Sequence, residues 1–359
     1  MTGPSRLPGF VHGLTRDELA AACARLGEPS YRSDQVWNWL YVQHADDWAR
    51  FTNIPASLRR GLAERYEIRP VTLLAAEGEH GQTQKLLAGL HDGRAVEEVL
   101  IPAAHGADKQ GRRFTVCLSS QVGCRFRCAF CASGTRGLER NLEPGEMVGE
   151  FLLGLQQAGE HPLTHVVFMG IGEPLDNYDA VLKAIRILND PGGIAIGARR
   201  ITISTCGLVP GIERLAGEGL QVELSVSLHA GQESVRSRLM PVNRIHSLSR
   251  LLDACRQYTA ATKRIITFEY ALIDGVNDQA HQARDLVDRL RPIPCRVNLI
   301  PLSPVAEFHG RPSPPEAAAR FLDTLNAAGI HATMRDSRGS AIRAACGQLR
   351  ARHRGKGEA

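Results

Sequence analysis

Apolar and polar residues follow two different rhythms along this chain, and the change between them falls near residue 113. Beyond that point, short strand-like runs alternate with longer runs whose apolar residues recur every three or four positions, as in an amphipathic helix. The strand-like runs are TVCLSS, HVVFMG, RRITIST, QVELSVSL, RIITFEYAL, CRVNLIP and HATMRD. The helical runs between them are GEMVGEFLLGLQQA, YDAVLKAIRIL, GIERLAGE, LSRLLDACRQY, AHQARDLVDRL and PEAAARFLDTLNAAG.

This alternation predicts six βα units followed by a seventh strand, over residues 113–349. Strands separated by helices pair in parallel, so the expected fold class is α/β. Six units are too few to close an eight-stranded barrel. The sequence therefore predicts a partial (β/α)6 barrel.

The first 70 residues have a helical pattern and predict a small N-terminal domain. Thr15 and Glu18 fit a capping box before LAAACARL. Ser33 is the candidate cap of DQVWNWLYVQH, and Pro55 with Ser57 opens ASLRRGLAERY. We interpret residues 1–70 as a module for packing or for docking a substrate.

Between this module and the barrel, residues 71–112 alternate with the period of strands. VTLLAAEG, QKLLAGL and AVEEVLIP predict a short antiparallel linker sheet with a turn at Asp92 and Gly93. Residues 350–359 resemble a solvated basic tail.

Composition narrows the class of protein. The chain has 359 residues, 43% hydrophobic and 23% charged, with no apolar run near the roughly 20 residues that span a bilayer. The first residues have no signal-peptide pattern, and nine unevenly spaced cysteines do not form a secreted disulfide framework. We therefore expect a cytoplasmic protein with a metal or redox role. The net charge of +5 is compatible with nucleic acid as a partner.

Three cysteines, Cys124, Cys128 and Cys131, lie in the stretch GCRFRCAFC at spacing C-x3-C-x2-C. Thiolates favour zinc or iron–sulfur clusters. A structural zinc site needs a fourth ligand from elsewhere in the chain. A [4Fe-4S] cluster on three cysteines instead leaves one iron open for a substrate, as catalytic zinc sites leave one position open.

Polar residues follow several of the predicted strands, at the ends where parallel barrels bind ligands. They are Gly172 and Glu173 in MGIGEPLDN, then Ser204, and then Ser227, Leu228 and His229. MGIGEPLDN is not a dinucleotide fingerprint, because Leu175 stands where the third glycine belongs.

The cysteine spacing, with Phe130 before the last cysteine, strongly resembles the radical S-adenosylmethionine (SAM) superfamily. The resemblance implies a [4Fe-4S] cluster on Cys124, Cys128 and Cys131, whose open iron chelates SAM. It also implies that an electron from the cluster cleaves SAM to a 5′-deoxyadenosyl radical. The stretch that contains Gly172 and Glu173 is then expected to bind the SAM amino group.

Further motifs resemble the RlmN/Cfr family: CLSSQVGC, GLERNL, MGIGEP, STCGLVP, SLHA, MPVN and AACGQL. That family methylates C2 or C8 of an adenine in 23S rRNA, and its C2 branch also modifies the adenosine beside the anticodon of some tRNAs. The GEP stretch and the helical N-terminal module favour the C2 branch. A C8-directed enzyme, another radical SAM enzyme and a non-catalytic iron–sulfur or zinc RNA-binding protein are the alternatives.

The resemblance also implies catalytic roles. Cys346 takes a methyl group from one SAM, and a second SAM yields the radical that joins this group to the RNA. Glu97, in VEEVLIP, removes the C2 proton; Glu98 is expected to face the other side of its strand. Cys117 then attacks the Cys346 sulfur and releases methylated RNA as a disulfide forms. The remaining cysteines, which fit no motif, are assigned to packing: Cys23, Cys206, Cys255 and Cys295.

At one SAM-binding position the chain departs from the family pattern. Ser303 precedes Pro304 where the family usually has Asn, and a serine is shorter and has only a hydroxyl. The contact to SAM is then lost, bridged by water or taken over by Asn298. A flavodoxin or ferredoxin is the expected reductant, and a monomer the expected state.

The helical module carries a local excess of positive charge. Arg59, Arg60, Arg65 and Arg69 lie within LRRGLAERYEIR and predict contacts to RNA phosphate. The competing interpretation is an ordinary solvated helix face.

Overall fold

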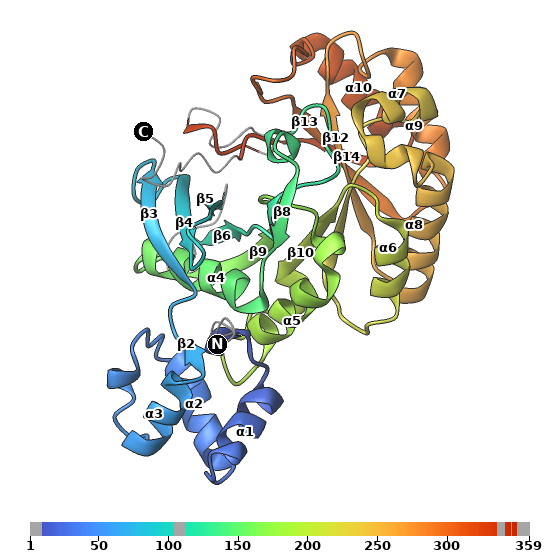
Figure 1. Ribbon diagram of the computed structural model, residues 1–359. Coiled ribbons are helices and arrows are strands. Elements are labelled where there is room, and N and C mark those ends of the chain that lie inside the picture. Colours follow the sequence, from blue (N-terminus) through green and yellow to red (C-terminus); the bar gives the residue numbers. More distant parts are fainter. Residues whose placement is uncertain (1–8, 104–112, 336–341, 346, 350–359) are drawn as a thin grey trace, which may run out of the picture.

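The computed structural model describes residues 9–103, 113–335, 342–345 and 347–349 (Figure 1). Its main sheet has ten strands in the order β14-β13-β12-β11-β10-β9-β6-β5-β4-β3. The parallel part comprises β6 (Phe114–Cys117), β9 (Leu163–Phe168), β10 (Ile201–Thr205), β11 (Glu223–Ser227), β12 (Ile266–Leu272), β13 (Cys295–Pro301) and β14 (His331–Met334). All seven predicted strands are present, so the α/β class and the partial barrel are confirmed.

Helices cover the outer face of the curved parallel sheet (Figure 1). They are α4 (Pro144–Ala158), α5 (Tyr178–Asn189), α6 (Val209–Ala216), α8 (Leu248–Thr262), α9 (Ala280–Leu290) and α10 (Pro315–Ala327). A further short helix, α7 (Glu233–Leu239), was not predicted. Because each crossover helix lies between sequential neighbours in the sheet, the carboxyl ends of the parallel strands share one rim.

The linker strands are not a separate sheet. They are β3 (Val71–Glu77), β4 (Gln84–Leu90) and β5 (Ala95–Pro102), antiparallel as predicted, with the turn at Asp92 and Gly93. Strand β5 also pairs antiparallel with β6, where Val99 lies opposite Cys117. The linker therefore continues the barrel sheet, and the side chains of β5 lie next to those of the barrel strand β6.

The N-terminal module consists of α1 (Arg16–Arg25), α2 (Tyr31–Tyr41) and α3 (Ala56–Ala63), with the small pair β1 (Gly9–Phe10) and β2 (Tyr66–Glu67). The capping box of Thr15 and Glu18 is confirmed. The expected cap at Ser33 is wrong, because α2 begins two residues earlier and Ser33 donates its hydroxyl to the Ser30 carbonyl inside the helix.

The module lies below the sheet in Figure 1 and packs against α4 and α5. Lys183 of α5 pairs with Glu18 at 2.6 Å. The buried Trp37 lies so close to Gly193 that a Cβ there would come within 2.7 Å of the indole nitrogen. The module is therefore fixed to the barrel through its helices.

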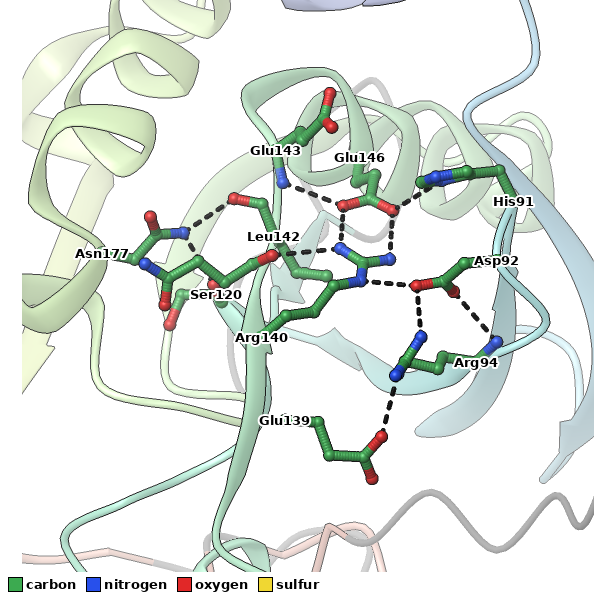
Figure 2. A network of polar contacts seen from close by, with 11 residues as sticks. His91, Asp92, Arg94, Ser120, Glu139, Arg140, Leu142, Glu143, Glu146 and Asn177 are labelled. Carbon is green, nitrogen blue, oxygen red and sulfur yellow. Dashed lines mark hydrogen bonds and ion pairs between the residues drawn. The ribbon is translucent and has the colours of Figure 1, made fainter. Parts of the chain in front are cut away.

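A network of ion pairs joins the β4–β5 turn to the start of α4 (Figure 2). Arg140 lies on β8 (Leu138–Asn141), which pairs with β7 (Gln121–Gly123) in a hairpin that was not predicted. Its guanidinium donates to both oxygens of the fully buried Glu146 at 2.7 and 2.8 Å, and to Asp92 at 2.6 Å. Although burial opposes ionisation, hydrogen bonds from Arg140 and Arg94 hold the pKa of Asp92 well below its ordinary value.

In the part of the chain that the structure describes, no helix is both long and apolar enough to cross a membrane.

Candidate active site

A pocket lies at the carboxyl ends of the parallel strands, and we call it the upper pocket. Its walls bring together most of the residues that the sequence singled out: Cys124, Cys128, Cys131, Gly172, Glu173, Ser204, Ser227, His229 and Ser303. The carboxyl ends of the parallel strands therefore surround a pocket, and most of the candidate site residues line it.

The cysteine loop is held in place by backbone hydrogen bonds at both ends. The Cys124 amide donates to the Gly137 carbonyl at 3.0 Å, and the Ala129 amide donates to the Leu239 carbonyl at the end of α7 at 2.9 Å. The Ala132 amide donates to the carbonyl of Gly347 at 2.7 Å. The loop is thus tied to the C-terminal segment as well as to the barrel.

The chemistry of this donor set fits an iron–sulfur cluster. Burial raises the pKa of Cys124 to about 12 and that of Cys128 well above its ordinary value, and neighbouring thiols add to both shifts. Buried thiols that disfavour one another's ionisation need a strongly cationic group if they are to act as thiolates. Among the described residues, no set of three His, Cys, Asp or Glu side chains is arranged around a single metal ion. The three thiols would supply three of the ligands of a [4Fe-4S] cluster.

Glu173 is buried and anchors the loop after β9. Its Oε1 accepts from the Leu175 amide at 3.1 Å and its Oε2 from the Cys206 amide at 2.7 Å. Burial raises the pKa of Glu173, and these hydrogen bonds oppose the shift. The side chains of Thr205 and Cys206 also hydrogen-bond to this carboxylate. The preceding Gly172 has φ +108°, and a Cβ there would meet Gln121 at 2.6 Å, so glycine is required.

His229 projects into the upper pocket in its neutral form. Its Nδ1 accepts from the Ala271 amide at 2.8 Å, which leaves the proton on Nε2. Burial, followed by the charge of Arg236, lowers the pKa of His229 to about 3. The ring meets Phe130 edge-on, with centroids 4.7 Å apart. His229 can therefore donate one hydrogen bond without carrying charge.

Two of the expected SAM contacts are placed differently. The Leu228 side chain is buried in the core and does not line the upper pocket. Asn298 does not line it either; its amide nitrogen donates to Glu269 at 3.1 Å, and its oxygen accepts from Thr333. Ser303 does line it, so the hydroxyl at this position remains the group that faces the cavity.

Glu97 and Glu98 lie on opposite faces of β5, as predicted. Glu98 is fully buried beneath α4, near Glu150. Glu97 shares its face with Val99, and Val99 lies opposite Cys117. Glu97 and Cys117 are therefore on the same side of the sheet, although neither lines the upper pocket.

The ammonium of Lys85 lies 3.6 Å from Glu97 and donates to the Ile342 carbonyl at 3.0 Å. Glu97 is thus close to the C-terminal segment. Cys346 itself lies outside the described residues. Its neighbour Gly347 lines the upper pocket, and Ser133 donates to the Leu349 carbonyl at 3.1 Å.

Sequence reasoning missed three residues of this region. Cys206, assigned to packing, lines the upper pocket beside Glu173. Arg236 is fully buried and donates to the carbonyls of Cys206, Ser227 and Leu228, so it fixes two strand ends. Glu269 lies in the middle of a buried strand. A charge inside the apolar run IITFEYAL was a visible signal for Glu269, whereas Arg236 had none.

Comparisons with known proteins agree with this architecture. The radical SAM superfamily model matches residues 118–287, and a model of the ribosomal RNA large subunit methyltransferase N-terminal domain matches residues 11–68. A solved radical SAM methyltransferase from Sphaerobacter thermophilus superimposes with a TM-score of 0.91 at 46% identity, covering 96% of this chain and 100% of that one.

The barrel and its three-cysteine pocket define a radical SAM enzyme. A probable dual-specificity RNA methyltransferase RlmN from Moorella thermoacetica is 48% identical over 95% of this chain and 96% of its own length. The dual-specificity RNA methyltransferase RlmN of Gluconobacter oxydans is 41% identical over 94% of this chain and 84% of its own. This chain belongs to the RlmN family of radical SAM RNA methyltransferases.

Proposed function

We propose that this enzyme methylates C2 of an adenine in 23S rRNA and C2 of the adenosine beside the anticodon in tRNA. The observation that carries the proposal is the similarity, over nearly the whole chain, to proteins named dual-specificity RlmN. The match of residues 11–68 to the N-terminal domain model supports the C2 branch.

Cys124, Cys128 and Cys131 would hold the [4Fe-4S] cluster. When bound, the cluster and SAM supply the one-electron chemistry that removes a hydrogen atom from a methyl group. Glu173, which lines the upper pocket, would accept a hydrogen bond from the SAM ammonium. Gly172 lets the backbone approach, and the polar groups of Ser204, Ser227, His229 and Ser303 line the same pocket.

Methyl transfer to RNA requires a carrier, because the C2–H bond of adenine is not acidic and the carbon is electron-poor. We assign this role to Cys346, whose thiolate takes a methyl group from one SAM, so that a second SAM is consumed in each turnover. Hydrogen removal from the S-methyl group yields a carbon radical that adds to C2. The RNA is then joined to the enzyme through a thioether.

Glu97 and Cys117 would complete the reaction from one face of the sheet. Glu97 takes the C2 proton, and Lys85 at 3.6 Å favours its charged form. The Cys117 thiolate attacks the Cys346 sulfur, a disulfide forms, and the bond between sulfur and the methylene carbon breaks. The electron pair of that bond stays with the adenine, and a proton added at the methylene carbon completes the methyl group. A flavodoxin or ferredoxin would supply electrons, and we expect a cytoplasmic monomer.

Mass spectrometry of RNA from cells with and without the gene tests this function. We expect 2-methyladenosine in 23S rRNA and tRNA only when the gene is present. The appearance of 8-methyladenosine instead would identify a C8-directed enzyme, and the absence of both would refute the proposal.

A further inference from the structure

Below the upper pocket, the open barrel encloses a second cavity of about 660 Å³, which we call the lumen. The two cavities share part of their walls: Met169, Glu269, Ile300, Ser303 and Arg335. The lumen is within the size range of small-molecule sites. It is flanked on one side by Ile101 and Pro102 at the end of β5 and on the other by Thr333 of β14.

The lumen is unusually polar for the inside of a parallel barrel, which is ordinarily packed with branched apolar side chains. Its walls include several hydroxyl, amide and charged groups on consecutive strands: Thr202, Ser225, Thr267, Glu269, Arg296 and Asn298. A polar interior of this kind is costly unless its groups are paired, so it indicates a ligand that is itself polar.

One carboxylate in the wall of the lumen lacks part of its hydrogen bonding. Glu269 is only 5% exposed, and its Oε1 accepts from Asn298 at 3.1 Å and from Ser225 at 3.4 Å. Among the described residues its Oε2 has no hydrogen-bond partner, and it is buried. A desolvated carboxylate oxygen without a donor costs free energy. Glu269 lines both cavities, so a donor from either side can complete its hydrogen bonding.

Opposing effects set the ionisation of Glu269. Burial raises the pKa of Glu269, but the nearby Arg335 and Arg296 and the hydrogen bonds from Asn298 and Ser225 oppose the shift. A carboxylate in this position selects a ligand with an N–H donor and disfavours one with a carbonyl.

We propose that the lumen receives the target base of the RNA and that Oε2 of Glu269 accepts a hydrogen bond from the exocyclic amino group of adenine. This inference rests on the proposed function and deepens it. Ala345 lines the lumen and Gly347 lines the upper pocket, so the two neighbours of position 346 contact one cavity each. Enzymes that modify a base within RNA extrude it into such a pocket.

Glu269 is then a specificity residue. Adenine offers an amino group at C6, purine offers only hydrogen, and hypoxanthine offers a carbonyl. Sites built to bind a hydrogen-bonding group reject analogues that lack it, because their own polar groups are left unpaired. The reconstituted enzyme should therefore bind adenine, purine and hypoxanthine RNAs with falling affinity.

The test uses three synthetic 23S rRNA fragments that differ only in the target base. Dissociation constants are measured by fluorescence anisotropy without reductant, and methylation rates with it. For the unsubstituted enzyme we expect adenine to bind about tenfold more tightly than purine, the value of one charge-assisted hydrogen bond. Glu269→Ala should reduce this ratio to about one.

Glu269→Gln keeps the size of the side chain and reverses its polarity. Because Asn298 and Ser225 both donate inward, the amide oxygen stays inward and the NH₂ group faces the cavity. This variant should bind hypoxanthine RNA more tightly than adenine RNA. Glu223→Gln is the matched control, since Glu223 also lines the lumen but is paired with Arg264 and Arg296. The control should keep the preference for adenine over purine.

Equal affinity of the unsubstituted enzyme for adenine and purine RNAs would overturn the inference, as would an unchanged ratio in both Glu269 variants. Thermal unfolding of each variant identifies misfolded protein, and the isosteric Glu269→Gln keeps the test valid if Glu269→Ala does not fold. If the enzyme methylates adenine RNA but binds adenine and purine RNAs equally well, this inference is contradicted and the proposed function is not. Absence of methylation by the unsubstituted enzyme contradicts the proposed function.

Discussion

Glu97 and Cys117 belong to parts of the sequence that look unrelated, yet they face the same side of one sheet. The reason is the pairing of β5 with β6, which places Val99 opposite Cys117 and Glu97 two residues farther along. The motifs alone predict both roles, but they do not reveal this pairing. Their shared face supports two successive steps at one site, proton removal and then release of the RNA.

Substitutions of Cys346, the methyl carrier, and of Cys117, which releases the RNA, should have different phenotypes. Cys117→Ala retains methyl transfer and radical addition but lacks the thiolate that breaks the thioether, so the purified protein should carry covalently bound RNA. Cys346→Ala and the double variant should carry none. A denaturing gel with and without ribonuclease distinguishes them. Cys255→Ala, at a buried position in α8, serves as the control and should also run free of RNA. A Cys117→Ala protein that turns over without an adduct would show that Cys117 only packs.

Lys85 should set the pH range in which Glu97 acts as a base. Removal of a cation 3.6 Å from a carboxylate disfavours the charged form and raises its pKa. Lys85→Met should therefore move the acidic limb of the rate profile to higher pH, by about one unit. Single-turnover methylation between pH 5 and 9 measures the shift.

Glu77→Gln removes the other carboxylate partner of Lys85, at 3.0 Å, and leaves the pair with Glu97 in place. This control should shift the acidic limb little. Identical profiles for Lys85→Met and the unsubstituted enzyme would mean that Lys85 does not tune the base.

At the scale of elements, the βα units were predictable because their apolar residues recur with a regular period. Elements that are fixed by irregular contacts could not be predicted in this way. The seven parallel strands and six crossover helices follow from apolar runs with clear periods. The hairpin of β7 and β8 is too short to show a period, and α7 is fixed by Arg236, whose carbonyl partners lie on other elements. The Ser33 cap failed because serine also occurs inside first turns, where it bonds to a preceding carbonyl.

The Arg140 network should be important for stability. Arg140→Ala leaves the fully buried Glu146 without its bidentate partner, so we expect the free energy of unfolding to fall by about 3 kcal/mol. Arg94→Ala, in the exposed part of the same network, should cost clearly less, because water screens its ion pairs. Urea unfolding compares the two variants. Equal losses would contradict the importance of burial here.

At the scale of the whole molecule, the catalytic hollow and the basic N-terminal module are parts of one body. The module is attached through α4 and α5, away from the strand ends that form the upper pocket. A substrate that engages both must be large, which agrees with membership of an RNA-modifying family. The sequence predicted both parts, but only the structure shows how they are joined.

Charge reversal on the module tests whether it contacts RNA. Arg60 is exposed on α3, and Arg65, just beyond it, pairs with the exposed Glu64 and the Gly61 carbonyl. The double variant Arg60→Glu, Arg65→Glu should bind RNA at least about tenfold more weakly and show a salt dependence reduced by about two phosphate contacts. The control is the pair Arg186→Glu, Arg214→Glu on α5 and α6, where both arginines bind Glu218. An unchanged salt slope would leave the arginines as a solvated helix face.

The barrel never closes into a ring: β14 ends the sheet on one side, while β6 continues into the antiparallel strands on the other. A closed ring can take a long polymer into its centre only if a free end is threaded through it. A ring with a gap accepts a bulged loop from the side, at any point along the polymer chain. For the proposed action on a base far from either end of a ribosomal RNA, the incomplete barrel therefore offers an entrance from the side that a complete barrel lacks.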